Sequence, residues 1–123
     1  MKSKFRVPDY LQHVLDAIER IRRYTSALSE ADFWLNDLVQ DAVLRNIEII
    51  GEAVRNIEIC DPQFASDHPE IPFREIYSMR NRLAHGYFAV NPGLVWEAVQ
   101  RDIPTLETQI TALRKMFAHP DAN

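Results

Sequence analysis

A chain of 123 residues has room for one compact domain, and its 46% share of hydrophobic residues excludes a disordered protein. A net charge of −4 argues against a generally basic nucleic-acid-binding surface, although arginines gather between Arg74 and Arg82. No apolar run reaches the ~20 residues that span a bilayer, and the basic residues 1–8 lead into no signal-peptide core, so we expect a cytoplasmic protein without membrane contact.

Apolar residues recur at spacings of three and four along the chain, and no alternating run or hairpin dipeptide indicates a strand. We predict four main helices and one short capped turn, over residues 8–28, 29–34, 37–60, 73–85 and 92–117. Asn36 and Asn91 suit N-caps, and Gly86 suits the left-handed residue that follows a helix. Residues 62–73 hold three prolines and are expected to form a loop or a short helical turn.

The predicted fold class is therefore all-α, an up-and-down bundle of four main helices plus short helical turns. It forms a single domain over residues 1–123, with a core at about 7–117 and frayed termini. Pro104 should bend the last helix, unless that helix starts near it. The single cysteine, Cys60, excludes an internal disulfide, and with four scattered histidines it supplies no cluster of zinc ligands, so we expect no metal or cofactor.

A polar residue and a glycine interrupt the apolar stripe of the second long helix. Asn46 falls on that stripe, and a buried amide needs hydrogen-bond partners, so it either braces a helix that carries the active site or fixes the register between two helices. Gly51 inside a helix costs ~1 kcal/mol relative to alanine, and close packing of a neighbouring helix would offset that cost.

Residues 80–87 combine two arginines, an asparagine, a histidine and a tyrosine. Arginine holds a fixed charge that grips phosphate, and histidine exchanges protons near neutral pH, so the pair suits binding or cleavage of a phosphodiester. His85 would serve as general base or acid and Arg80 would stabilise the phosphorane, while Asn81 would orient His85 or donate to a phosphate oxygen. The same residue types at a helix end also form caps, ion pairs and ordered surface, without catalysis.

The spacing of this segment poses a geometric problem. Asn81 and His85 share a face of a regular helix, but Arg80 lies roughly 140° around the axis from His85. Either the helix ends near Ala84 and lets His85 swing back, or Arg80 of one copy completes the site of a second copy across a two-fold interface.

The pattern Arg80-x4-His85-x-Tyr87 resembles the signature of the HepT-like toxins, a branch of the HEPN ribonuclease superfamily. Three further segments are similar to that family in the same order, at residues 45–53, 71–76 and 90–96. The one departure is Phe73, where tryptophan is more usual. The resemblance covers about residues 7–115.

The resemblance implies a HEPN bundle that acts as a metal-independent endoribonuclease and works as a homodimer, with the two motifs facing each other in a cleft. Its catalytic residues would be Arg80 and His85, with Asn81 at the adjacent polar position. The expected products are a 2′,3′-cyclic phosphate and a 5′-hydroxyl, and transfer RNA is a suggested substrate. Further candidates for phosphate or RNA binding are Arg45, Arg74 and Arg82.

The resemblance also implies a partner, as in a type VII-like toxin–antitoxin pair. A nucleotidyltransferase antitoxin of the MNT type would transfer AMP from ATP to Tyr87 and so block the site. The alternative is a non-catalytic helical module that docks on a nucleotidyltransferase and presents its substrate. The acidic net charge favours that alternative mildly, and the intact residues Arg80, His85 and Tyr87 argue against it.

Overall fold

The computed structural model of the protein describes residues 5–83 and 91–117, and for Arg80 and Asn81 it describes the backbone alone. These residues form helices, with no strand among them, so the predicted all-α class is confirmed. In chain order the elements are α1 (Val7–Thr25), α2 (Glu30–Trp34), α3 (Asp37–Cys60), α4 (Pro62–Asp67), α5 (Phe73–Leu83), α6 (Pro92–Glu97), the π-helical turn η1 (Ala98–Asp102) and α7 (Ile103–Lys115).

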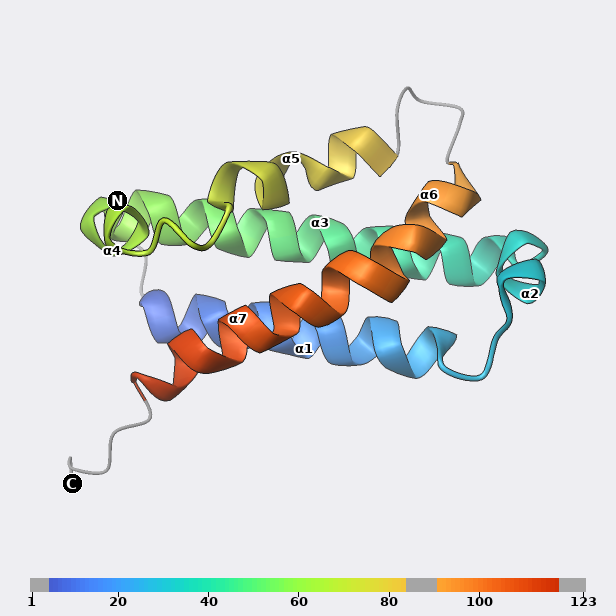
Figure 1. Ribbon diagram of the computed structural model, residues 1–123, viewed down its shortest axis with the longest axis horizontal. Coiled ribbons are helices and arrows are strands. Elements are labelled where there is room, and N and C mark those ends of the chain that lie inside the picture. Colours follow the sequence, from blue (N-terminus) through green and yellow to red (C-terminus); the bar gives the residue numbers. More distant parts are fainter. Residues whose placement is uncertain (1–4, 84–90, 118–123) are drawn as a thin grey trace.

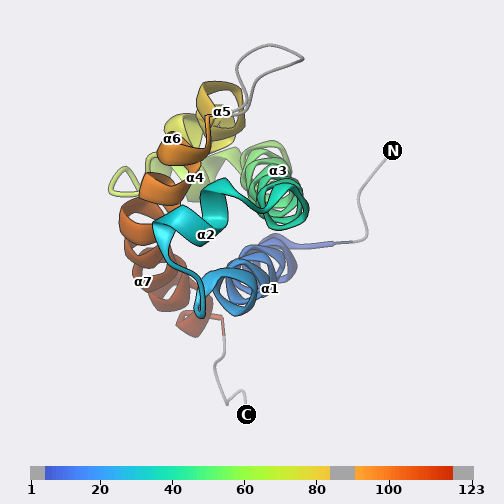
Figure 2. The same ribbon diagram turned by 90° about the vertical axis from the view of Figure 1, so that its right-hand side faces the viewer.

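The four main helices α1, α3, α5 and α7 alternate in direction along the bundle (Figure 1). The long helices α1 and α3 lie side by side, α5 packs on α3, and α7 packs on α1. The short helix α2 lies across one end of the bundle (Figure 2). Its Phe33 is fully buried, and the centroid of the Phe33 ring lies 5.4 Å from that of the Trp96 ring. The helix α4 lies at the opposite end, against α3.

The core is built from the apolar stripes that the spacing predicts. Fully buried side chains come from every long helix, namely Leu11, Val14, Ile18, Ile21, Val43, Ile47, Ile50, Val54, Ile57 and Ile110. Val39 and Ala42, in the first two turns of α3, are half-buried. None of the helices in the described ranges has the length and apolar character that a bilayer span requires.

Two predicted boundaries are wrong by a few residues. The first helix ends at Thr25 rather than Leu28, because Ser29 must take an extended backbone conformation to cap α2, where its hydroxyl accepts from the Asp32 N–H at 3.1 Å. The last helix ends at Lys115, so Phe117 lies beyond it and is 40% exposed. Residues 62–73 contain the short helix α4, the second of the two predicted alternatives.

The predicted interruption at Pro104 takes the form of a π-helical turn. In η1 the Ile103 N–H donates to the Ala98 carbonyl, five residues back, and α7 then begins at Ile103. Pro104 thus occupies the first turn of α7, where its missing N–H leaves no hydrogen bond unmade. A new helix starts at this point, as the second alternative for Pro104 required.

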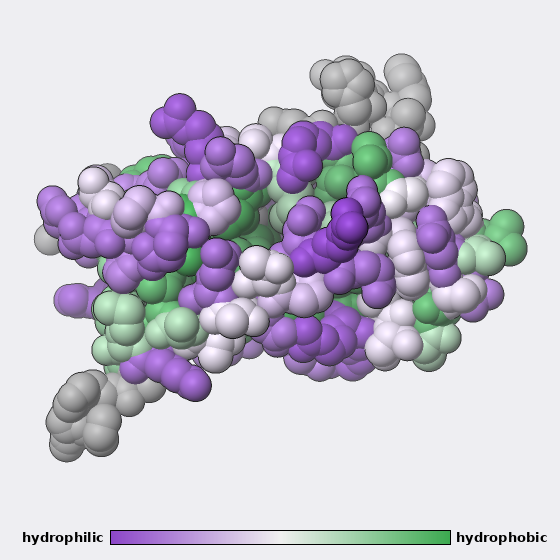
Figure 3. Space-filling model, in the orientation of Figure 1, coloured by the Kyte–Doolittle hydropathy of each residue, from purple (hydrophilic) through white to green (hydrophobic). Residues whose placement is uncertain are grey.

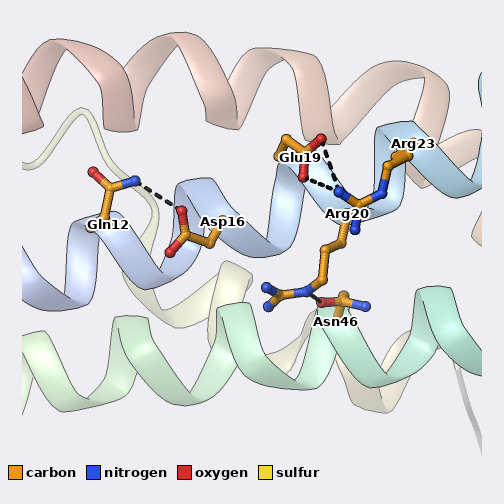
Figure 4. A network of polar contacts seen from close by, with 6 residues as sticks. All are labelled: Gln12, Asp16, Glu19, Arg20, Arg23 and Asn46. Carbon is orange, nitrogen blue, oxygen red and sulfur yellow. Dashed lines mark hydrogen bonds and ion pairs between the residues drawn. The ribbon is translucent and has the colours of Figure 1, made fainter.

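Asn46 fixes the register of α1 against α3. The Arg20 Nε–H donates to Asn46 Oδ1 at 2.7 Å, and Asn46 Nδ2 donates to the Ala42 carbonyl at 2.8 Å (Figure 4). The amide is 4% exposed, so these two bonds satisfy a group that would be costly to bury alone. Of the two roles predicted for Asn46, the structure shows the link between helices.

The visible face is mostly hydrophilic, with hydrophobic patches toward both ends of the molecule (Figure 3). Large apolar side chains are exposed on α2, on the residue that follows it, on the start of α3 and on α6, namely Trp34, Leu35, Leu38 and Leu94. Arg22 on α1 donates to both carboxylate oxygens of Glu107 on α7, which holds the pKa of Glu107 below its ordinary value. This ion pair ties α7 to α1.

Candidate active site

The helix α5 carries the first half of the Arg80–Tyr87 signature. Its apolar side chains Phe73, Ile76, Met79 and Leu83 are buried at spacings of three, three and four, which turns one face of the helix toward the core. Tyr77 lies off that face, and positions 80 and 81 follow it by one helical turn. Arg80 and Asn81 therefore occupy the last described turn of α5, as the sequence predicts.

Gly51 on α3 brings α5 close. A Cβ atom at this position would lie 3.3 Å from the Tyr77 carbonyl oxygen, which is tighter than ordinary van der Waals contact, and 3.7 Å from the Tyr77 Cα, which is an ordinary contact. The helix cost of this glycine is thus offset by backbone packing, as predicted. The same Cβ would lie 3.8 Å from the Ile76 carbonyl oxygen, so the segments 45–53 and 71–76, two of the four family-like segments, meet in space just before the turn that holds Arg80.

The second half of the signature, with His85, Gly86 and Tyr87, lies outside the described residues. The description resumes at Asn91, whose N–H donates to the Leu83 carbonyl at 3.5 Å. The start of α6 therefore lies next to the end of α5.

Asn91 also caps α6, as predicted. Its side-chain oxygen accepts from the backbone N–H groups of Gly93 at 3.0 Å and Leu94 at 3.2 Å.

A groove of about 370 Å³ lies between α3 and α5, beside the turn that holds Arg80. Its lining is mainly polar and consists of Arg45, Glu48, Gly51, Glu52, Arg55, Asn56 and Tyr77. Arg45 and Glu48 form an ion pair at 3.5 Å, one turn apart on α3. The guanidinium of Arg55 lies 4.9 Å from the centre of the Tyr77 ring, a cation–π contact between the two helices.

The three arginines predicted to bind phosphate are not brought together. Arg45 lines the α3–α5 groove. Arg74 lines a hollow beside α4, and Arg82 lines a largely apolar one between α5 and α7, with Met79 and Leu106 among its walls. Arg45, Arg74 and Arg82 thus face three separate hollows, and only Arg45 shares one with the face of α5 that carries Tyr77.

Sequence reasoning missed the groove residues Arg55, Asn56 and Tyr77. A signal was present, because Arg45, Glu48, Glu52 and Arg55 recur at intervals of three, four and three and so form one polar stripe on α3. Tyr77 precedes Arg80 by one turn. No three side chains of His, Cys, Asp or Glu in residues 5–83 and 91–117 lie close enough together to hold a metal ion.

Comparison with known proteins places most of the chain in one family. The family model described as "Ribonuclease HepT-like" matches residues 14–113. A "Probable ribonuclease HepT" from Thermococcus cleftensis is 43% identical over 107 residues, which are 87% of this chain and 94% of that protein. A "Putative RNase" from Caldanaerobacter subterraneus subsp. tengcongensis is 38% identical over 101 residues, 82% of this chain and 88% of that protein.

A longer relative comes from Methanocaldococcus jannaschii and is named "Gamma-glutamylcyclotransferase and putative RNase". It is 45% identical over 101 residues, and the chain spans only 44% of its length. No solved structure matches the chain.

Proposed function

The chain belongs to the HepT-like ribonuclease family, and from that premise we propose that it is an endoribonuclease that cleaves RNA with Arg80 and His85 and without a metal ion. The observation that carries this proposal is the complete signature Arg80-x4-His85-x-Tyr87 inside the matched region. The position of Arg80 and Asn81 in the turn after Tyr77, on a helix held against α3, supports it.

The proposed reaction uses the 2′-hydroxyl of RNA as nucleophile. His85 accepts the proton of that hydroxyl as the new bond from the 2′-oxygen to phosphorus forms, and the bond from phosphorus to the 5′-oxygen breaks. The imidazolium that forms on His85 then donates its proton to the leaving 5′-oxygen. Arg80 stabilises the charge of the phosphorane, and Asn81 orients His85 or donates to a phosphate oxygen. The products are a 2′,3′-cyclic phosphate and a 5′-hydroxyl.

We propose that the site is composite and forms in a homodimer. On a regular helix Arg80 and His85 lie roughly 140° apart, so one copy does not direct both side chains at a single phosphate without breaking the helix between them. A two-fold axis near the end of α5 supplies Arg80 from one copy and His85 from the other.

Cleavage of RNA in the presence of a chelator tests the proposed function. We expect purified protein with EDTA to cut total transfer RNA and to leave 2′,3′-cyclic phosphate ends, detected by end-specific ligation. An all-deoxy strand of the same sequence should stay intact because it lacks the nucleophile. Protein of unmodified intact mass that cuts no RNA would contradict the proposal, and its co-purification with a nucleotidyltransferase would favour the binding-module alternative.

We propose that a nucleotidyltransferase antitoxin inactivates the enzyme through Tyr87. The phenol oxygen of Tyr87 would attack the α-phosphate of ATP and release pyrophosphate, which leaves a bulky anion two residues from His85. With that partner and ATP, the intact mass of the chain should rise by one or more AMP units, and RNA cleavage should stop. A Tyr87→Phe protein should keep both its mass and its activity; if it is still modified and silenced, another residue is the acceptor.

A further inference from the structure

We propose that the groove between α3 and α5 is a nucleobase subsite that selects guanine beside the cleaved phosphodiester. This inference rests on the proposed ribonuclease function and deepens it, because it names the base that the enzyme prefers. It is carried by the lining of the groove and by its position next to Arg80 on α5.

The groove lies where the neighbouring nucleotide of a bound substrate would lie. Tyr77 forms part of its wall, and Arg80 follows three residues later on the same helix, ~4.5 Å further along the axis. A nucleotide next to a phosphate held at Arg80 would therefore be within reach of the groove. Its volume of about 370 Å³ falls within the ~300–1,000 Å³ of small-ligand sites.

The charges of the groove favour a base over a phosphate. Two arginines, Arg45 and Arg55, face two carboxylates, Glu48 and Glu52, so these four side chains carry no net charge. A phosphate would be repelled by the carboxylates as strongly as it is drawn by the guanidinium groups. A neutral base with both donors and acceptors on its edge fits such a lining better.

Arg55 and Tyr77 provide a stacking surface. The Arg55 side chain is exposed, its guanidinium lies over the Tyr77 ring at 4.9 Å, and it forms no ion pair with the described residues. Unpaired RNA bases stack on aromatic rings and on guanidinium planes. Because the two side chains come from different helices, a base in this place also bridges α3 and α5.

Glu52 decides which base is bound. This carboxylate is exposed in the groove and makes no hydrogen bond or ion pair with the described residues, whereas Glu48 is engaged by Arg45. An ionised carboxylate only accepts hydrogen bonds, and guanine is the base that presents two adjacent donors, N1–H and N2–H, to its two oxygens. Adenine and cytosine offer one donor beside an acceptor, and uracil offers one donor between two acceptors. The amide of Asn56, also in the lining, can donate to guanine O6.

Two measurements test the subsite. In the first, 5′-GMP, AMP, CMP and UMP are each titrated into isotope-labelled protein and followed by NMR. We expect GMP to shift the Arg55 Nε–H resonance and the backbone amides of Gly51 and Tyr77, with an affinity at least about five-fold above the other nucleotides, the lower end for a bidentate base contact. Glu52→Gln should remove this preference, because a carboxamide offers only one acceptor atom.

The second measurement maps cleavage sites in a randomised RNA pool. Wild-type protein should show guanine enriched at one fixed position from the cut, and Glu52→Gln should lose that enrichment because cleavage at guanine sites slows to the rate at the other bases. Tyr77→Leu should slow cleavage at all sites. Glu19→Gln, which removes an exposed carboxylate from α1, is the matched control and should keep the guanine preference.

The outcomes separate the subsite from the proposed reaction. If RNA is cut without base preference and Glu52→Gln behaves as wild type, the subsite is wrong and the ribonuclease stands. If no RNA is cut but GMP binds selectively and Glu52→Gln abolishes that selectivity, the groove recognises guanine and the ribonuclease proposal fails. Equal weak shifts with all four nucleotides would overturn the inference, and circular dichroism of each variant shows that it is folded.

Discussion

Replacing either His85 or Arg80 with alanine is expected to reduce RNA cleavage by at least about 100-fold. Proton transfer by a positioned side chain contributes ~10²–10⁴-fold to a rate, and a donor that stabilises developing charge contributes ~10²–10³-fold. In the proposed reaction each residue serves one of these functions, so neither loss is compensated by the other. The measurement is the initial rate of transfer RNA cleavage in EDTA, with all proteins at equal concentration.

Arg101→Ala is the control for general loss of positive charge. Arg101 is an exposed arginine of η1 that pairs with Glu97 one turn away and lines none of the three hollows described above. Its variant should cleave RNA within about two-fold of the wild type, as exposed ion pairs contribute little to structure. A His85→Ala protein that cuts RNA as fast as the wild type would rule out the proposed mechanism.

The variants Arg80→Ala and His85→Ala together test whether the site is shared between subunits. After refolding of an equal mixture, half of the dimers pair Arg80→Ala with His85→Ala, and each such dimer holds one intact composite site. Activity should therefore recover to about a quarter of the wild-type level, whereas sites formed within one copy would give no recovery. Co-expression with two different affinity tags isolates the mixed dimer and removes the dependence on random exchange.

Replacing Gly51 with valine is expected to destabilise the protein by about 1–3 kcal/mol, the cost of overfilling a packed contact. The Cβ alone would lie 3.3 Å from the Tyr77 carbonyl oxygen, and the two γ-carbons of valine would push the backbone of α5 away from α3. Urea unfolding followed by circular dichroism gives the change in the free energy of unfolding. A variant as stable as the wild type would show that α5 can move without cost.

Gly51→Ala is the matched substitution at the same position. Alanine gains ~1 kcal/mol of helix propensity over glycine, which offsets the loss from one tight contact with backbone, so we expect a net change within about 1 kcal/mol. The difference between valine and alanine at this site thus isolates the packing of α5 on α3. Because Tyr77 moves with α5, the valine variant should also weaken binding in the α3–α5 groove.

Helix starts were predicted well because capping is local. Asn36 accepts from the Val39 N–H at 3.1 Å, and Asn91 accepts from Gly93 and Leu94, so each cap involves residues two or three positions apart. The predicted end of α1 was wrong for the same kind of reason, since the helix must stop early enough for Ser29 to cap α2. The prediction extended α1 too far because it gave the helical pattern of α1 more weight than the cap at Ser29.

Contacts between distant residues were not predicted. The polar partner of Asn46 is Arg20, 26 residues earlier, and the sequence left open whether that amide served an active helix or a helix register. The sequence also did not predict that Arg45, Arg74 and Arg82 line three separate hollows, because the face on which each side chain lies depends on how the helices pack.

The sequence by itself determined the all-α class, the buried stripes and the candidate residues Arg80, Asn81, His85 and Tyr87. Helical periodicity and the eight-residue signature both depend only on residues that are close together in the chain. Only the tertiary structure decided that α5 lies against Gly51 and that Arg55 meets Tyr77 across a polar groove. Such contacts depend on how far and at what register two helices approach, and that is set by side-chain packing over the whole core.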